Sequence, residues 1–76
     1  MHVVIAKVNE VLFDGEARSL TVPGADGEMT VLARHMPLIT TLKRGAITVR
    51  TPDEQKEFAA EGGILEVRPD GATVIL

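Results

Sequence analysis

The stretch ILEVRPDGATVIL, residues 64–76, decides the fold class. In its first half Leu65 and Val67 alternate with charged residues, and a two-residue period is typical of a β-strand that buries one face. The segment Pro69-Asp70-Gly71 then supplies the residue types of a tight turn. A second apolar run, Thr73 to Leu76, follows, so the stretch predicts two strands joined by a reversal.

The same pattern extends outward over the rest of the chain. In AITVR, residues 46–50, Ile47 and Val49 share one face, which we expect to point inward. Runs rich in Val, Ile, Leu and Thr recur about every eight to twelve residues, which is typical of an all-β sandwich or barrel. The runs predicted as strands are His2–Val8, Val11–Phe13, Glu16–Val22, Glu28–Leu32, Leu38–Leu42, Ala46–Arg50, Lys56–Ala60, Ile64–Arg68 and Thr73–Leu76. The predicted reversals are Asp14-Gly15, Pro23-Gly24, Asp26-Gly27, Arg44-Gly45, Gly62-Gly63 and Pro69-Asp70-Gly71.

The first run has apolar residues on both of its faces. Val3 to Ala6 are all apolar, whereas a strand with one solvated face would alternate. The run is therefore expected either to be central in its sheet or to be covered by a partner.

One segment carries signals for a helix as well as for a hairpin. In TPDEQKEFAAEGG, residues 51–63, Thr51 is a suitable helix N-cap, Pro52 suits the first helical position and Gly62 suits the helix end. The segment nevertheless lies between two strand-like runs of similar length. We therefore predict a hairpin through Thr51 to Glu54.

The composition bounds the class of protein. The chain has 76 residues, which suits one domain, and no cysteine, so disulfides and thiolate zinc sites are excluded. A net charge of −3 and only two aromatic residues, Phe13 and Phe58, disfavour nucleic-acid binding. No uncharged stretch approaches the roughly 20 residues of a membrane helix, and there is no signal-peptide pattern. A cytoplasmic location is therefore expected.

The two histidines belong to no recognisable catalytic or metal motif. His35 has no nearby cysteine and no His-x-x-x-His spacing, and the single serine, Ser19, is not in a Gly-x-Ser-x-Gly motif. His2 is expected at a mobile end. No catalytic residue and no metal site is predicted. His35 is expected to be either a loop histidine that hydrogen bonds to the backbone or a contact residue on a binding surface.

Two acids flank the predicted turn at Asp26-Gly27. An exposed corner does not prepare a carboxyl group for proton transfer, so neither Asp26 nor Glu28 is predicted to be catalytic. A protruding Glu28 that pairs with a partner's arginine is the better functional hypothesis. Met29 and Met36 are expected to fill gaps in the core or at an adaptable contact surface.

Longer motifs resemble a known family. VLFDGEARSLTVPGADGEMTVLARHMPLITTLKRGAITVR, residues 11–50, and EFAAEGGILEVRPDGATVIL, residues 57–76, resemble the N-terminal β-sandwich domain of the epsilon subunits of F-type ATP synthases. The family's motifs appear in order as Phe-x-Gly, Pro-Gly-x-x-Gly-Glu-x-x-Val-Leu, His-x-Pro-Leu-Ile-Thr-x-Leu-Lys-x-Gly and Gly-Gly-Ile-Leu-Glu-Val. The match covers nearly all of residues 1–76, which are expected to form a single domain.

The resemblance implies an all-β fold, a flattened β-sandwich of two mostly antiparallel sheets with about eight to ten short strands. It also implies a non-catalytic rotor subunit of the central stalk, which links the gamma subunit to the membrane c-ring and transmits torque for proton-driven ATP synthesis. No cofactor is implied. The isolated domain is expected to be a monomer, and within the complex to be peripheral on the cytoplasmic side of a bacterial inner membrane. The alternative is an unrelated small β-sandwich module that binds a protein or a ligand.

Positions that match the family's motifs imply two contact regions, one for the c-ring and one for gamma. The implied c-ring contacts are Asp26, Gly27, Glu28 and Met29, and the implied gamma contacts are His35, Met36 and Pro37.

The chain departs from the family's pattern in three places. Ala33-Arg34 stands where the family usually has Pro-Gly before the histidine, and Arg44 stands where proline usually precedes Gly45. The sequence ends at Leu76, where most members continue into a helical hairpin. Since that hairpin carries the family's ATPase inhibition and, in some members, a nucleotide site, neither is expected of these residues.

Overall fold

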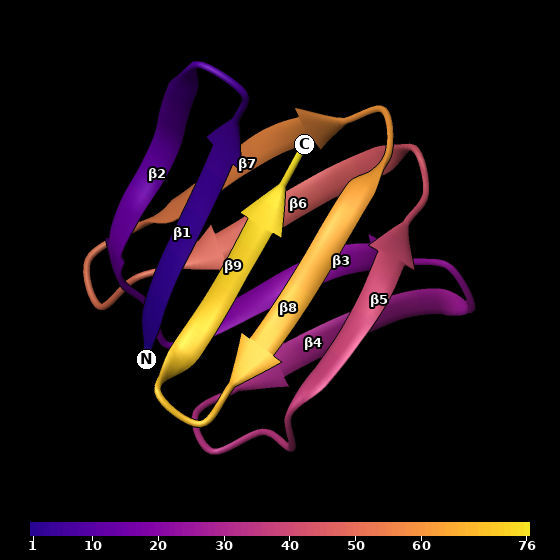
Figure 1. Cartoon of the computed structure of the whole chain (residues 1–76). Coiled ribbons are helices and arrows are strands. Elements are labelled where there is room, and N and C mark those ends of the chain that lie inside the picture. Colours follow the sequence, from indigo (N-terminus) through magenta and orange to yellow (C-terminus); the bar gives the residue numbers. More distant parts are fainter.

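Nine strands and no helix make up the chain. The computed structural model describes residues 1–76, and its strands follow one another with short connections (Figure 1). The all-β prediction is therefore confirmed. None of the chain forms a helix that is long and apolar enough to cross a membrane. The strands are β1 (His2–Lys7), β2 (Glu10–Glu16), β3 (Ser19–Gly24), β4 (Gly27–Leu32), β5 (Leu38–Leu42), β6 (Gly45–Arg50), β7 (Gln55–Ala60), β8 (Gly63–Arg68) and β9 (Gly71–Ile75).

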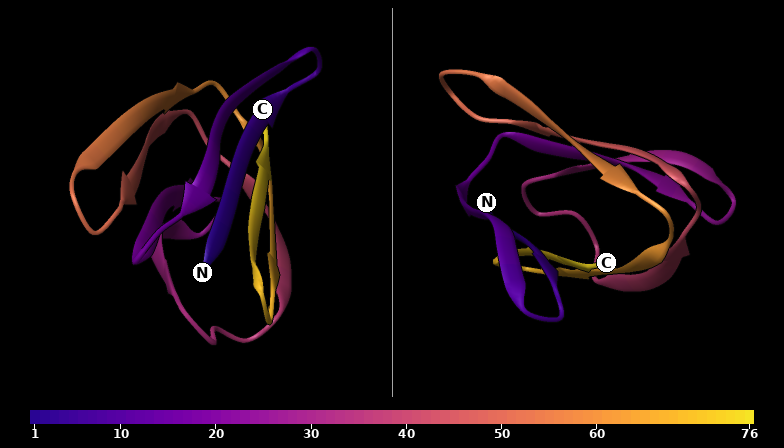
Figure 2. Two further views of the ribbon diagram at one scale, coloured as in Figure 1. Left: turned by 90° about the vertical axis from the view of Figure 1, so that its left-hand side faces the viewer. Right: turned by 90° about the horizontal axis from the view of Figure 1, so that it is seen from above.

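The strands lie in two layers that face each other, as Figure 2 shows from two further directions. The front sheet has the order β2-β1-β9-β8-β5, and the back sheet has the order β4-β3-β6-β7. All neighbouring strands are antiparallel except β1 and β9, which are parallel. The prediction of a sandwich of mostly antiparallel sheets is therefore confirmed.

The two sheets are joined at one corner. Gly24 at the end of β3 pairs with Leu42 at the end of β5, and the backbone N–H of Lys43 donates to the carbonyl of Pro23 at 2.8 Å. The chain crosses from the front sheet to the back sheet directly after this point, between β5 and β6, and returns between β7 and β8. The nine strands consequently form one hydrogen-bonded network that is curled into a sandwich.

A layer of aliphatic side chains fills the space between the sheets. Ile47 and Val49 of β6 and Leu65 of β8 are fully shielded from solvent, as their alternation predicts. This layer excludes water from both inner faces and is the main source of stability. Its buried apolar residues are Val3, Ile5, Ala17, Leu20, Val22, Val31, Leu42, Ile47, Val49, Ala60, Leu65, Val67, Ala72 and Val74.

Side chains close the sandwich between the edge strands β2 and β7. The rings of Phe13 and Phe58 meet edge to face, with their centroids 6.3 Å apart and their planes at 63°. Lys56 Nζ lies 5.7 Å from the centroid of the Phe13 ring, which adds a cation–π contact. The only two aromatic residues therefore cover the core where backbone pairing ends.

Two of the predicted reversals are wrong. Asp14-Gly15 lies inside β2, because β1 supplies backbone partners as far as Glu16. The expected strand Val11–Phe13 is therefore longer, and the strand expected to begin at Glu16 begins at Ser19 instead. Pro23-Gly24 lies inside β3, and the reversal follows it. Neither β5 nor β6 has a residue in register with this proline, so its missing N–H interrupts no pair with them.

The segment between β6 and β7 is a hairpin turn, as predicted. Thr51 Oγ1 accepts hydrogen bonds from the backbone N–H groups of Asp53 at 3.3 Å and Glu54 at 3.0 Å. These are the contacts of a helix cap. The N–H of Thr51 donates to the carbonyl of Glu54 at 2.8 Å, and the chain then pairs with β6. The capping signal is therefore real, but cross-strand pairing makes the segment a strand.

Substitution of Leu65 by alanine tests the inner layer. Because Leu65 is fully buried, we expect Leu65→Ala to lower the free energy of unfolding by about 2–5 kcal/mol in urea denaturation. Ile64 is the preceding residue of the strand and is 48% exposed on the outer face. Ile64→Ala is therefore expected to cost less than about 1 kcal/mol. Equal losses would contradict this assignment of faces.

Candidate functional site

The two groups of predicted contact residues lie at opposite ends of β4. Residues 26–29 form the β3–β4 turn and the first part of β4, and residues 35–37 belong to the loop that leads from β4 to β5. A strand of six residues is about 20 Å long. The structure therefore does not bring the two groups together, and they form two separate surfaces.

The β3–β4 turn presents acidic side chains on a short hairpin. Asp26, Gly27 and Glu28 are exposed, whereas Met29 is partly buried and packs against the core. Neither Asp26 nor Glu28 forms an ion pair within the chain. Both carboxylates are therefore available to a partner, while the methionine fixes the hairpin to the body of the domain.

Other charged residues lie at the same end of the molecule. The end of β5 is hydrogen bonded to the β3–β4 turn, because the N–H of Ala25 donates to the carbonyl of Thr41 at 3.0 Å. Lys43 and Arg44 connect β5 to β6. Arg44 pairs with Glu61 of the β7–β8 turn at 3.4 Å, and Lys43 is exposed. Figure 1 shows the three turns together at the right of the molecule. The sequence did not indicate this grouping, because the turns are far apart along the chain.

The loop between β4 and β5 holds its histidine through the backbone. The N–H of His35 donates to the carbonyl of Leu32 at 3.1 Å, and His35 Nδ1 lies 2.9 Å from the carbonyl oxygen of Met36. Since a carbonyl oxygen only accepts, Nδ1 is the donor. No acidic side chain pairs with His35, and Ser19 lies on β3 in the back sheet. The loop therefore lacks the parts of a nucleophilic site, while Met36 is 78% exposed and Pro37 is also exposed.

The outer surface of the front sheet carries a continuous apolar row. The register places Ile64 of β8 beside Ile75 of β9, then Ala6 of β1 and Val11 of β2. Ile39 of β5 lies next to this row and lines a hollow together with Ile64 and Ile75. Ile39 is 72% exposed and Val11 is 62% exposed. We call these five residues the apolar face.

The apolar face continues into the β4–β5 loop. A second shallow hollow is lined by Pro37, Leu38 and Ile39 on one side and by the end of β8 and the residue after it on the other. Pro37, a predicted gamma contact, therefore borders the same surface as Ile39. Sequence analysis found only the β1 part of this face, through the run of apolar residues. That strand is interior to its sheet, with β2 on one side and β9 on the other.

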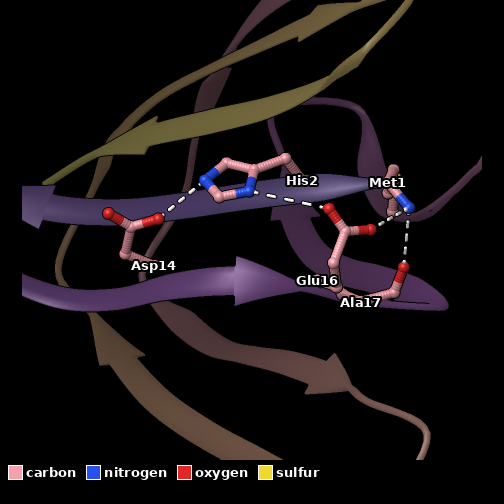
Figure 3. A network of polar contacts seen from close by, with 5 residues as sticks. All are labelled: Met1, His2, Asp14, Glu16 and Ala17. Carbon is pink, nitrogen blue, oxygen red and sulfur yellow. Dashed lines mark hydrogen bonds and ion pairs between the residues drawn. The ribbon is translucent and has the colours of Figure 1, made fainter.

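Polar contacts hold the far edge of the front sheet, where β1 meets β2 (Figure 3). His2 lies between two carboxylates, with Nε2 2.6 Å from Asp14 and Nδ1 3.7 Å from Glu16. The amino group of Met1 donates to the carbonyl of Ala17 at 3.0 Å and pairs with Glu16 at 3.3 Å. The expectation that His2 lies at a mobile end is therefore wrong, because β1 and these contacts hold it in place.

Gly27 determines the shape of the acidic hairpin. Its φ angle is +133°, and an added β-carbon would meet no atom within 4 Å. The cost of a side chain there is therefore a backbone cost, and we expect Gly27→Ala to lower the free energy of unfolding by about 1–3 kcal/mol in thermal denaturation. Gly15→Ala in β2 is the control, because its β-carbon would make an ordinary contact of 3.6 Å with Phe13. A similar loss in both variants would refute the backbone explanation.

Comparison with known proteins identifies the family. The family model described as "ATP synthase, Delta/Epsilon chain, beta-sandwich domain" matches residues 1–76. The ATP synthase epsilon chain of Delftia acidovorans is 42% identical over 76 residues, which are 99% of this chain and 55% of that protein. The epsilon chain of Caulobacter vibrioides is 37% identical over 75 residues, covering 99% of this chain and 87% of that protein. The chain thus spans about half the length of the first relative and most of the second.

Solved structures agree on the fold. A chain of the Euglena gracilis mitochondrial ATP synthase, in a structure of OSCP, F1 and the c-ring, matches with a TM-score of 0.88 at 21% identity over 96% of this chain and 48% of its own length. A chain in the central stalk and c-ring structure of the Tetrahymena thermophila mitochondrial ATP synthase matches with a TM-score of 0.84 at 16% identity, over 99% of this chain and 61% of its own length. From its sequence and its fold together, the chain belongs to the ATP synthase delta/epsilon family and forms the β-sandwich domain of that family.

Proposed function

We propose that this domain is a non-catalytic coupling part of the central stalk of a bacterial ATP synthase. It binds the gamma subunit through one surface, rests on the c-ring through another, and transmits torque between them. The observation that carries the proposal is the presence of two unlike exposed surfaces, the apolar face and the acidic hairpin, on one close-packed body. Family membership argues against the alternative of an unrelated binding module.

The apolar face is the proposed gamma surface. Four of its five side chains, on β2, β5, β8 and β9, are exposed, and the face adjoins the loop that carries His35, Met36 and Pro37. Contiguous exposed apolar surface on a small domain marks a site of protein contact, because water solvates it poorly. Methionine and proline at its border suit an adaptable contact that costs little conformational entropy. The hydrogen bond of His35 to the backbone keeps the loop in shape for this contact.

The acidic hairpin of Asp26, Gly27, Glu28 and Met29 is the proposed c-ring contact. Its two carboxylates have no cation within the chain, so they are free to form charge-assisted hydrogen bonds with arginine or lysine on the polar loops of the ring. Lys43 and Arg44 at the same end extend this surface, and they give it charges of both signs. Such a contact orients the two bodies more than it binds them tightly.

A stiff body suits this role. The chain has 46 backbone hydrogen bonds, and its inner layer of aliphatic side chains is buried. Interiors packed in this way are only slightly compressible, so torque applied at one end reaches the other with little strain. In this role the domain needs no cofactor and no catalytic residue of its own. It places the domain at the membrane periphery on the cytoplasmic side, through the complex.

A charge on the apolar face tests the gamma contact. Ile39→Lys places a cation opposite Glu66 on the front sheet, and Thr48→Lys places one opposite Glu57 on the back sheet. We expect Ile39→Lys to weaken binding to the gamma subunit at least about ten-fold in calorimetric titration, since it puts a charge into an apolar contact. Thr48→Lys is the matched control and should bind like the wild type. Equal affinity for both variants would exclude the apolar face as the gamma surface.

Charge reversal at Glu28 tests the c-ring contact. In the reconstituted ATP synthase of the same organism, Glu28→Lys should reduce proton pumping per ATP hydrolysed, because a carboxylate contact becomes a repulsion. Affinity for the gamma subunit should change less than about two-fold, since Glu28 is not part of the apolar face and lies at the other end of β4 from the loop that carries His35. Asp53→Lys, in the exposed β6–β7 turn, is the control and should leave pumping unchanged. Loss of gamma binding in Glu28→Lys would show that the hairpin belongs to the other partner.

A further inference from the structure

Arg34 has a backbone conformation that its side chain disfavours. It is the only residue other than glycine with a positive φ angle, at +68°. In this left-handed region the β-carbon of an L-residue comes too close to the following carbonyl oxygen, whereas glycine adopts it freely. The turn itself is fixed by the hydrogen bond from the N–H of His35 to the carbonyl of Leu32. Glycine would therefore form the same loop without strain.

Nothing within the chain compensates for this strain. The guanidinium of Arg34 forms no hydrogen bond and no ion pair. By contrast, Arg68 is held by Glu66 at 3.1 Å and by Thr73 at 2.9 Å, and Arg44 is paired with a glutamate. A side chain that strains the backbone without an internal partner points to a contact outside the chain.

The surroundings of Arg34 suit a contact with protein. Leu32 is 57% exposed and Met36 is 78% exposed, so the cation lies on a loop with exposed apolar neighbours in the sequence. Arginine and methionine are enriched at the cores of protein interfaces. A guanidinium binds a carboxylate through two parallel hydrogen bonds, which gives direction as well as attraction. A lipid surface is a poorer fit, because membrane binding of this kind uses clusters of about four to eight basic residues.

We propose that Arg34 is a specificity-determining contact of this domain, whose guanidinium binds a carboxylate of the subunit that covers the β4–β5 loop. This inference rests on the proposed function, under which that subunit is gamma. The strain at Arg34 is then retained because the bound complex needs the cation. The free domain would be more stable without it.

Three substitutions at this position separate charge from backbone strain. Arg34→Gly removes the cation and relieves the strain, Arg34→Ala removes the cation and keeps most of the strain, and Arg34→Lys keeps the charge but loses the double hydrogen bond. We expect the dissociation constant for the gamma subunit of the same organism to rise about ten-fold in both uncharged variants, and by less in the lysine variant. The melting temperature should rise by about 4 °C in Arg34→Gly only.

The salt dependence of gamma binding and the affinity of Arg34→Gly test whether the charge of Arg34 contributes to the contact. Wild-type binding should weaken more steeply with added salt than binding of Arg34→Ala, because only the wild type has the charged pair. If Arg34→Gly is stabilised yet binds gamma as tightly as the wild type, the inference is wrong. If the glycine variant binds weakly but the alanine variant binds like the wild type, loop flexibility is the cause and the inference is also wrong. Failure of the folded wild type to bind gamma would instead overturn the proposed function.

Discussion

The burial of one layer of aliphatic side chains between two sheets sets the register of the strands in this domain. Every strand that faces the layer must place alternate residues inward, and Leu20, Ile47 and Leu65 fix that alternation in three different strands. Slipping any of these strands by one residue would expose its apolar side and bury its polar side. The register, and with it the position of every outward side chain, follows from this layer.

Both candidate surfaces are consequences of that register. When Leu65 points inward, its neighbour Ile64 must point outward, where the pairing of β8 with β9 and of β9 with β1 sets it in one row with Ile75 and Ala6. The acidic hairpin begins where β3 leaves the core, and it is attached to that core by Met29. The two surfaces are therefore connected through a single packed body. This connection is what a coupling role between two partners requires, since movement of one surface must carry the other.

The backbone conformation suits the residue type at Gly27 but not at Arg34. Gly27 has a positive φ angle that only glycine adopts without strain, and the hairpin uses it to present two unpaired carboxylates. Arg34 has a positive φ angle that glycine would satisfy better, and its cation has no partner inside the chain. Strain of this kind is common at functional sites, where binding and stability place different demands on one residue. The β4–β5 loop is therefore the part of the domain where sequence and fold conflict most clearly.

The strands and most of the turns were predictable from the amino-acid sequence, because the two-residue period and the turn residues are local properties. The hairpin at Thr51 was predicted from its place between two strand-like runs, and pairing of β7 with β6 is what prevents the capped turn from continuing as a helix. The position of Asp14-Gly15 inside a strand was not predictable locally, because it depends on β1, which provides the backbone partners that carry β2 past the glycine. The acidic turn and the histidine loop were visible as candidates, but their separation by the length of β4 was not. The apolar face could not be predicted for the same reason. Ile39 and Val11 lie on one surface only because distant strands pair with one another, and no local sequence pattern encodes those pairings.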